Sequence, residues 1–353
     1  MTFAFVQPSL SLRKAHLHQS SRTWTCSLTA PPAAAKAAKA SSLLAPGQSH
    51  FLHVDDLSPA ELKRILQSAK KIKDADLLND ADYRPLLNKA MSMVFAKPSS
   101  RTRVSFETAM FKLGGHALAL GPEVGVNTRE AAGDVARVLS GMTDVIMARL
   151  FAHGDLVQLA ERASVPVING LTDYNHPCQI VADALTMAET RGALEGAKVV
   201  YVGDGNNIVH SWVELAAVAP IEFVCCCPEG YAPDMGLVER ARRRGARVSV
   251  SHDVGEATRG ADFLYADVWA SMGQKEELAE RERRFQGFQV TDQMVKGTGV
   301  ETRFLHCLPA ERGREVTDEV MEAGYSEVFR QAENRMHAQV AIVLHCMGVG
   351  LEV

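Results

Sequence analysis

The sequence lacks several features that define large classes of protein. It has no uninterrupted apolar run of about 18 residues, the length that a membrane-spanning helix needs. It also lacks a basic excess, since 38 Lys and Arg residues face 42 Asp and Glu residues and the formal net charge is −4. Proteins that bind the nucleic-acid backbone usually carry such an excess or a basic stripe. We therefore expect neither a membrane protein nor a general nucleic-acid binder.

The seven cysteines form no recognisable framework. Their number is odd, none belongs to a Cys-x-x-Cys pair, and three are adjacent at 225–227. Disulfide scaffolds and zinc ribbons show paired spacing, and the histidines show no metal-ligand spacing either. We expect no metal site, a reducing compartment, and a packing role inside a strand for the three adjacent cysteines.

The first 54 residues contain no Asp or Glu. They hold five basic residues and twelve Ser or Thr residues, a composition typical of an organelle transit peptide. We expect residues 1–50 to be a leader outside the fold. Because only two of the basic residues are Arg, a plastid is the preferred destination and a mitochondrion the alternative. An ordinary disordered tail is the other interpretation.

The rest of the chain alternates strand and helix patterns, and its length predicts two domains. Ser58, Pro59 and Glu61 form the N-terminal signature of a first helix. Strands are expected at 91–96, 165–168, 198–202, 221–226, 247–251, 263–267 and 304–307. Helices are expected at 209–219, 234–244, 253–258 and 331–344, besides one that ends at Gly114. Strands separated by helices of this length predict two α/β halves with parallel sheets and a junction around 180–197.

Two motifs at expected helix starts suit a phosphate and a carbonyl. Residues 97–103 read Lys-Pro-Ser-Ser-Arg-Thr-Arg, so guanidinium groups, hydroxyls and free helix N–H groups converge there as an oxyanion requires. His176 and Gln179 follow a turn and supply a polarising donor and an amide. The alternatives are a solvated basic helix start and a structural His-Pro turn.

Two further regions lie where expected strands end. Residues 202–207 read Val-Gly-Asp-Gly-Asn-Asn, which lacks the third glycine of a dinucleotide fingerprint. We therefore expect no nucleotide cofactor there, but a polar substrate near Asn207. Asp267 and Cys307 each follow a strand on the edge of the sheet where ligands bind, and together they suit an amino group. A buried structural cysteine is the alternative.

Taken in order, these motifs resemble those of the ornithine carbamoyltransferases. Together with the leader, they resemble the plant and algal organellar type of that family. The resemblance runs from about residue 51 to 344. Ser-Ser-Arg-Thr-Arg and His-Pro-Cys-Gln are shared by carbamoyltransferases generally. The Ser271-Met272-Gly273 loop and His-Cys-Leu-Pro at 306–309 are more specific to the ornithine enzymes.

The resemblance implies an α/β fold of two doubly wound parallel-sheet domains joined by inter-domain helices. Residues 51–182 would bind carbamoyl phosphate, 183–330 would bind L-ornithine, and 331–353 would form a helix that packs back on the first domain. The implied reaction gives L-citrulline and phosphate, needs no cofactor, and takes place in a homotrimer. A carbamoyltransferase for putrescine or aspartate is the alternative. A nicotinamide-dependent dehydrogenase and a non-catalytic binding protein are alternatives from other classes.

The resemblance also implies the residues of the site. For carbamoyl phosphate they are Ser99, Ser100, Arg101, Thr102, Arg149, His176, Gln179, Cys307, Leu308 and Arg335. For ornithine they are Asn207, Asp267, Ser271 and Met272. Of these, Arg101, His176, Asp267 and Cys307 are expected to act on the reacting atoms.

The chain departs from the family pattern at two places. Ser100 stands where a Thr is usual, which keeps the hydroxyl. The loop 121–129 lacks the His or Gln that usually reaches a neighbouring subunit's site. Completion of the site by a neighbouring subunit is therefore in doubt at that loop.

Overall fold

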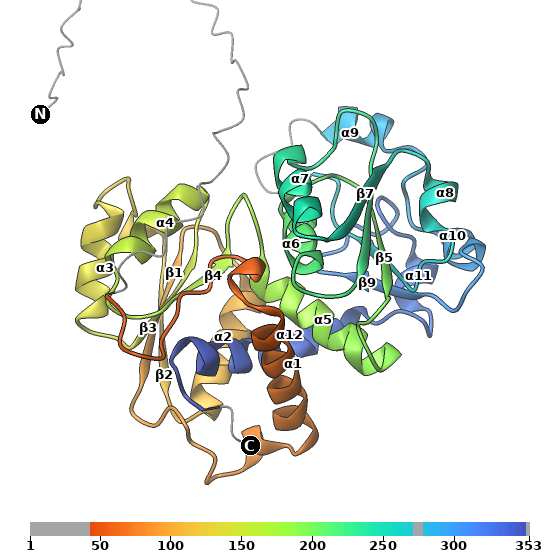
Figure 1. The fold of residues 1–353 in the computed structure, drawn as a ribbon. Coiled ribbons are helices and arrows are strands. Elements are labelled where there is room, and N and C mark those ends of the chain that lie inside the picture. The colour runs from red at the N-terminus through yellow and green to blue at the C-terminus, as the bar shows by residue number, and fades with distance from the viewer. Residues whose placement is uncertain (1–42, 271–277, 351–353) are drawn as a thin grey trace, which may run out of the picture. The chain divides into compact units, whose positions relative to one another are not determined.

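The computed structural model describes residues 43–270 and 278–350. Most of the expected leader and the positions Ser271, Met272 and Gly273 lie outside the described residues. The described chain contains two parallel β-sheets, each with its own helices (Figure 1). This confirms the α/β fold with two parallel-sheet halves.

The first sheet has four parallel strands in the order β2-β1-β3-β4. The strands are β1 (Ala90–Phe95), β2 (His116–Leu120), β3 (Val145–Arg149) and β4 (Val167–Leu171). The helices of this half are α1 (Pro59–Asp74), α2 (Ser100–Lys112), α3 (Ala132–Ser140) and α4 (His153–Arg162), with short turns η1 (Val54–Asp56), η2 (Leu77–Asn79) and η3 (Pro122–Val124). Strands β1, β3 and β4 are almost fully buried, as their continuous apolar runs require.

The second sheet has five parallel strands in the order β7-β6-β5-β8-β9. They are β5 (Lys198–Val202), β6 (Glu222–Cys226), β7 (Arg247–Ser251), β8 (Phe263–Ala266) and β9 (Arg303–His306). The helices are α6 (Asn207–Ala216), α7 (Met235–Arg243), α8 (Val254–Thr258), α9 (Leu278–Arg284), α10 (Asp292–Gly297) and α11 (Asp318–Glu322). The three adjacent cysteines are buried in and just after β6.

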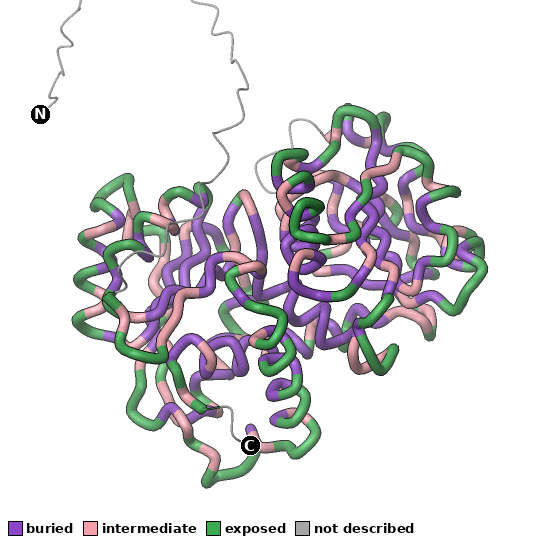
Figure 2. The backbone as a smooth tube through the Cα atoms, viewed as in Figure 1, coloured by how far each residue is buried: buried purple, intermediate pink, exposed green. Residues whose placement is uncertain are grey.

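Two long helices connect the halves. α5 (Pro177–Arg191) runs from the end of β4 toward β5 without a break, and α12 (Val328–Cys346) packs against α1, α2 and α5. Every residue of α5 from Pro177 to Met187 is buried. A helix that is buried on all sides is an interior element, and Figure 2 shows that the buried part of the chain includes much of these helices and of the central strands.

The sequence predicted most of the strands but missed two of them, and it gave no prediction for helices α3, α4, α9, α10 and α11. The capping box of α1 is present, because Ser58 Oγ accepts from the Glu61 N–H and the Glu61 carboxylate accepts from the Ser58 N–H. Strands β2 and β3 were not predicted: β2 is only half-buried and β3 has five residues. β4 begins two residues later than expected and ends three residues later, because Asn169 and Gly170 are part of the strand. A buried amide at Asn169 is tolerated because its Nδ2 donates to the Leu52 carbonyl.

In each sheet the strand order reverses once along the sequence. The reversal lies between β1 and β3 in the first sheet and between β5 and β8 in the second. In open α/β sheets ligands bind at this point, beyond the carboxyl ends of the strands. The fold thus marks two places for ligands before any side chain is considered.

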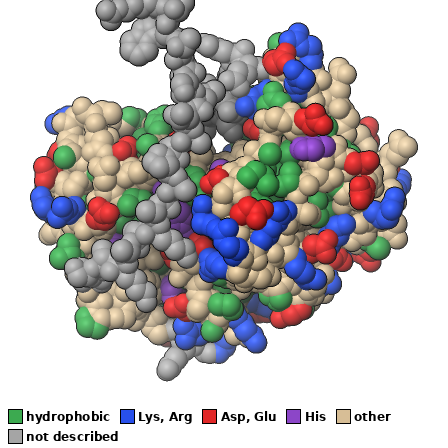
Figure 3. Space-filling view, turned by 45° about the horizontal axis from the view of Figure 1, so that its top comes forward, with side chains coloured by type: hydrophobic (Ala, Val, Ile, Leu, Met, Phe, Trp, Pro, Cys, Tyr) green, Lys and Arg blue, Asp and Glu red, His purple; other side chains and the backbone are tan. Residues whose placement is uncertain are grey.

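The surface carries charges of both signs. On the face drawn in Figure 3, Lys and Arg side chains lie among Asp and Glu side chains. Among the described residues, no helix combines the length and the apolar character that crossing a membrane requires.

We expect Ser58→Ala to destabilise the protein by about 0.5–2 kcal/mol, because it removes the N-cap acceptor of α1 and one half of the capping box. Chemical denaturation measures the change in the free energy of unfolding. Lys70→Ala, on the exposed side of the same helix, is the control. Its ion pair with Asp74 is solvent-exposed and contributes at most about 1 kcal/mol. Equal stability of Ser58→Ala and the wild type would contradict the assignment.

Candidate active site

The first reversal point carries the basic motif. β1 ends at Phe95, which pairs with Arg149 of β3. Four residues separate β1 from α2, which begins at Ser100. Ser99 is the N-cap of α2, and its Oγ accepts from the Thr102 N–H at 3.4 Å. The first turn of a helix presents N–H groups without intrahelical partners, which suits an anion.

Two buried arginines extend this anion site. Arg149 and Arg335 are only 7% and 3% exposed. Arg335 of α12 donates to Thr102 Oγ1 at 3.0 Å and to Gln179 Oε1. Among the described residues, the Nε atoms of Arg149 and Arg335 are buried without a hydrogen-bond partner. A buried donor without an acceptor is costly, so the arrangement is one that an anionic ligand would complete.

The electrostatics agree with that geometry. Burial, followed by the charges of Arg335 and Arg101, lowers the pKa of Arg149 to about 10. Burial likewise lowers the pKa of Arg335. Both shifts disfavour the charged guanidinium groups in the unliganded protein, and an oxyanion bound beside them would favour the charged forms.

His176 lies between these cations and the start of α5. Its backbone N–H donates to Ser211 Oγ at 2.7 Å, and its Nδ1 is buried without a hydrogen-bond partner in the described chain. Burial, then the charges of Arg335, Arg149 and Arg101, hold its pKa well below the usual range. The imidazole is therefore neutral at physiological pH and can donate only one ring N–H.

Gln179 is held by protein groups. Its Nε2 donates to Asp183 Oδ1 at 2.8 Å and its Oε1 accepts from Arg335. The predicted contact of this amide with the carbamoyl group stays a prediction. In this structure Gln179 fixes the guanidinium of Arg335.

The second reversal point carries a carboxylate and a thiol. Asp267 follows β8, and its Oδ2 accepts from Asn206 Nδ2 at 2.9 Å. Cys307 follows β9, and its Sγ donates to Asp267 Oδ1 at 3.1 Å. Burial of the thiol raises the pKa of Cys307 well above its usual value, and the charge of Asp267 raises it further. Cys307 is therefore a protonated donor and not a thiolate nucleophile.

The residues around Cys307 are fixed by their own hydrogen bonds. Leu308 has a φ of +58°, which is unusual for a non-glycine residue, and its N–H donates to His306 Nδ1 at 2.9 Å. His306 Nε2 lies 3.2 Å from Glu315 Oε1. The ligand atoms of Asp267, His306 and Cys307 lie within 4.8 Å of one another, but these bonds already engage both ring nitrogens and the thiol.

The two groups of residues are electrostatic neighbours. Cys307 lies close enough to Arg149 and Arg335 for a charge on its sulfur to affect the pKa of both guanidinium groups. The structure thus brings together a cluster of three arginines, a neutral His176 and the Asp267–Cys307 pair.

The comparison with known proteins agrees with this arrangement. The aspartate/ornithine carbamoyltransferase carbamoyl-P binding domain matches residues 49–189, and the Asp/Orn binding domain of the same family matches 195–346. The chain belongs to the aspartate/ornithine carbamoyltransferase family.

Individual carbamoyltransferases are similar over nearly the whole chain. The chloroplastic ornithine carbamoyltransferase of Pisum sativum is 56% identical over 329 residues, 93% of this chain and 87% of the pea protein. The ornithine carbamoyltransferase of Chromohalobacter salexigens is 46% identical over 83% of this chain and 96% of its own length. The solved ornithine carbamoyltransferase of Pyrococcus furiosus has a TM-score of 0.81 at 45% identity, covering 85% of this chain and 97% of that one.

The carbamoyltransferase fold also explains the glycine-rich segment after β5. A Cβ at Gly205 would lie 2.3 Å from the Pro233 backbone nitrogen, so this glycine permits two backbone segments to approach closely. Asp204 pairs with Arg281 at 2.7 Å. Both observations give the segment a structural role.

Sequence reasoning missed several polar residues that support the site. Asn206 caps α6 and contacts Asp267, whereas the predicted Asn207 donates to the Thr172 carbonyl at 2.9 Å. Gln331 of α12 donates to Asp183 at 2.7 Å. The tandem asparagines at the helix start were the available signal for Asn206. Gln331 had none, because its role depends on how α12 packs against α5.

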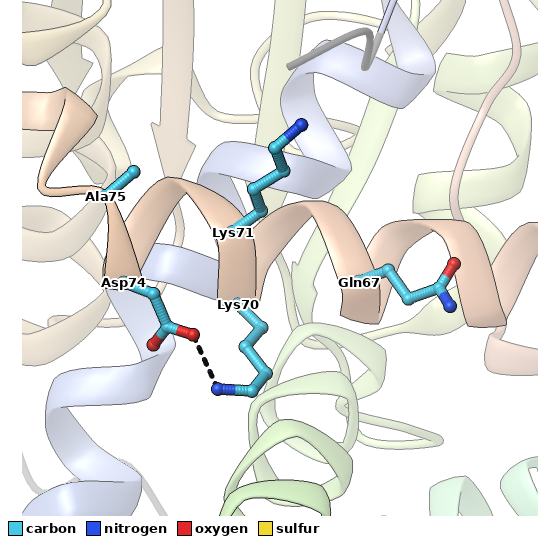
Figure 4. A pocket seen from close by; sticks show the side chains of 5 residues that line it. All are labelled: Gln67, Lys70, Lys71, Asp74 and Ala75. Atoms are coloured by element: carbon cyan, nitrogen blue, oxygen red, sulfur yellow. Dashed lines mark hydrogen bonds and ion pairs between the residues drawn. The ribbon is translucent and has the colours of Figure 1, made fainter.

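A surface hollow along α1 is separate from this site. It is lined by Gln67, Lys70, Lys71, Asp74 and Ala75, and Figure 4 shows Lys70 bonded to Asp74 there. The pair is exposed. Among the described residues, none of the five makes a hydrogen bond or ion pair to Arg101, Arg149 or Arg335. We assign the hollow no function.

We expect the thiol of Cys307 to react slowly with an alkylating reagent at pH 8, because its pKa is raised well above the usual value. Asp267→Asn removes the negative charge that contributes to this shift, so it should accelerate alkylation by about tenfold for each unit by which the pKa falls. Mass spectrometry of the peptide that contains Cys307 measures the rate. Asp292→Asn, on α10, is the control. Slower alkylation in Asp267→Asn would contradict the assigned contact.

Proposed function

We propose that this chain is an ornithine carbamoyltransferase whose reaction takes place between the arginine cluster and the Asp267–Cys307 pair. The observation that carries the proposal is the presence of two buried guanidinium groups, Arg149 and Arg335, with unsatisfied donors next to a carboxylate–thiol pair. Carbamoyl phosphate supplies the anion that the guanidinium groups would bind. An amine supplies the hydrogen-bond donors that the Asp267–Cys307 pair would accept.

Carbamoyl phosphate would lie at the start of α2. Its phosphate would accept from the first-turn N–H groups, from the hydroxyls of Ser99, Ser100 and Thr102, and from the guanidinium groups. Arginine binds such oxyanions in a bidentate manner that lysine cannot reproduce. The same donors stabilise the charge of the departing phosphate, because that charge grows as the bond breaks.

His176 would polarise the carbamoyl carbonyl. Because its imidazole is neutral, it can donate one ring N–H to the carbonyl oxygen as negative charge develops there. Its buried Nδ1 has no partner among the described residues, which agrees with a role toward substrate.

Ornithine would place its δ-amine beside Asp267 and Cys307. Asp267 accepts from an ammonium or amine, and the Cys307 sulfur lies next to it. The amine must lose a proton before it attacks, since a free alkyl amine has a pKa of about 10.4. The predicted contacts of Ser271 and Met272 with ornithine lie outside the described residues and stay predictions.

The step itself balances without a covalent enzyme intermediate. The lone pair of the δ-nitrogen forms a bond to the carbamoyl carbon, and the bond from that carbon to the phosphate oxygen breaks. The electron pair leaves with phosphate, which can take the proton that the amine releases. The protein supplies orientation and charge stabilisation, and both are large contributions to catalysis.

We expect Arg101→Ala to weaken the binding of carbamoyl phosphate by about 1.5–3 kcal/mol, roughly 10- to 150-fold, because a charge-assisted contact is lost. Arg101→Lys should recover only part of the affinity. Isothermal titration calorimetry measures the affinity directly.

Arg103→Ala is the matched control for Arg101→Ala. Arg103 lies two residues further along α2 and forms an exposed ion pair with Glu107 at 2.9 Å. This substitution should leave the affinity unchanged. Wild-type affinity in Arg101→Ala would overturn the phosphate site at α2.

A plastid destination is supported by the acid-free leader and by the pea relative, whose name includes chloroplastic. We expect a fluorescent protein fused to residues 1–54 to accumulate in plastids of plant cells. The same fusion with the basic residues of the leader changed to Glu should remain in the cytosol. Import into mitochondria would favour the alternative, and a cytosolic wild-type fusion would contradict the leader.

A homotrimer is supported by apolar side chains that the first half exposes. Phe111 and Met142 are 75% and 74% exposed, and Leu87, Val104 and Val138 are at least half exposed. Apolar groups gathered on one half are typical of an interface. Analytical ultracentrifugation tests the proposal, and the expected mass is three times that of the chain.

A further inference from the structure

A buried polar network lies behind His176 and is not used by the proposed reaction. It begins at His53, the N-cap of η1, whose Nδ1 lies 2.8 Å from Glu214 Oε1 of α6. The Glu214 side chain is 1% exposed. A carboxylate that is buried so completely requires a cation and hydrogen bonds, and Glu214 also accepts from the Val54 N–H at 3.0 Å and from Asn175 Nδ2.

The network continues from His53 into the loop that precedes His176. His53 Nε2 lies 3.1 Å from His153 Nε2, and His153 Nδ1 lies 3.0 Å from Thr172 Oγ1. Thr172 in turn contacts Asn175 Oδ1 at 3.4 Å. One unbroken series of polar contacts therefore joins Glu214 to the loop at 172–175.

The geometry determines where the protons are. The Nδ1 of His53 lies 2.8 Å from Glu214 Oε1 and 3.0 Å from Asn175 Nδ2, and the buried carboxylate favours a proton on it. If Nε2 carries one too, it donates to His153 Nε2, and the neutral His153 donates from Nδ1 to Thr172. In that state the buried Glu214 charge is neutralised and each ring nitrogen has a partner. A neutral His53 would leave the Glu214 carboxylate without a counter-charge.

We propose that His53 is a positioning residue for the carbamoyl-transfer reaction: as an imidazolium paired with Glu214, it holds His153 and the 172–175 loop so that His176 is correctly placed. The inference deepens the proposed function and rests on it. His53 is the N-cap of η1 in the first half, and the loop that it holds precedes α5 and contacts the start of α6.

The loop transmits the position of His53 to two site residues. Asn175 precedes His176 directly and is fully buried, with its Nδ2 donating to the Leu52 carbonyl at 3.1 Å. The Thr172 carbonyl accepts from Asn207 Nδ2 at 2.9 Å. A change at His53 therefore affects His176, which is proposed to polarise the carbamoyl carbonyl. It also affects Asn207 at the start of α6.

The protonation of His53 depends on the groups around it. Burial lowers its pKa, but the charge and hydrogen bond of Glu214, with Asp56 and Asp55, raise it to about 9. From α4, His153 has its pKa lowered to about 3 by burial and by the charge of His53. Tyr174 packs edge-on against the His53 ring, and His210 of α6 lies behind Tyr174. Arg244 after α7 pairs with Asp55.

The sign of the pH dependence follows from the raised pKa. The pair stabilises the fold fully below pH 6.5, the ordinary pKa of His, and this contribution is lost as the pH rises to about 9. Above that pH, neutral His53 presents a bare Nε2 to the Nε2 of His153. Turnover should therefore decline above about pH 9.

The test uses His53→Asn in the full chain, because the Asn amide can still donate to Glu214 but cannot reach His153. We expect kcat for citrulline formation to fall about 10- to 100-fold, since misplacement of a catalytic group by about 1 Å costs this much. The KM for carbamoyl phosphate should change little, because the loss affects the transition state. His153→Gln is the second variant, and because it keeps a donor for Thr172 its kcat should fall less than that of His53→Asn.

Glu214→Gln provides a readout that a merely structural role would not give. It keeps the size of the side chain and removes the charge that raises the pKa of His53. The alkaline decline of kcat should therefore move from about pH 9 to lower pH. An unchanged pH profile in folded Glu214→Gln protein would overturn the proposal.

His50→Asn is the matched control. His50 lies three residues before His53, and its Nδ1 accepts from the Val167 N–H at 3.0 Å. Among the described residues it makes no hydrogen bond to the 172–175 loop, so its substitution should leave kcat and the pH profile unchanged. Equal kcat in His53→Asn and His50→Asn would overturn the proposal.

Hydrogen exchange separates this inference from the proposed function. The amides of residues 172–176 should exchange faster in His53→Asn than in the wild type and in His50→Asn. If the wild type forms no citrulline, the proposed function fails, and exchange still decides whether His53 holds the loop. If the wild type forms citrulline and exchange is unchanged, the positioning role of His53 is wrong.

Discussion

The site depends on positive charge that the fold buries with no ion pair to a carboxylate among the described residues. Arg149 and Arg335 come from β3 and α12, and each keeps a buried Nε without a partner among the described residues. Such an arrangement costs free energy in the unliganded protein, and the hydrogen bonds of Arg335 to Thr102 and Gln179 offset part of it. The neutral state of His176 follows from the same charges. An anionic substrate is thus the natural partner of the whole cluster.

The two sheets supply this chemistry at corresponding places. In each, the strand order reverses, and the polar groups follow the strands that flank the reversal: Arg149 and the α2 start in the first, Asn206 and Asp267 in the second. α5 and α12 are the elements that connect the halves, and they also carry Gln179, Gln331 and Arg335. Packing of these buried helices therefore determines the stability of the fold and the geometry of the site together.

The sequence predicted what depends on local pattern. The capping box of α1, the strands of the second sheet and the four motif regions could be found from residue types and spacing, because each is a property of a few neighbouring residues. Gln331, Asn175 and Glu214 could not, because their roles depend on contacts between segments far apart in the chain. The same limit applies to Gln179, for which the sequence suggested a substrate contact and the structure shows bonds to Arg335 and Asp183.

The most direct test of the account is the stoichiometry of the reaction catalysed by the full chain. Carbamoyl phosphate and L-ornithine are mixed with the protein, and phosphate and citrulline are measured together, with putrescine and aspartate as comparison acceptors. The account predicts one citrulline for each phosphate released above the uncatalysed rate, and little carbamoylated product from the other acceptors. Phosphate release without citrulline, or equal transfer to aspartate or putrescine, would contradict it.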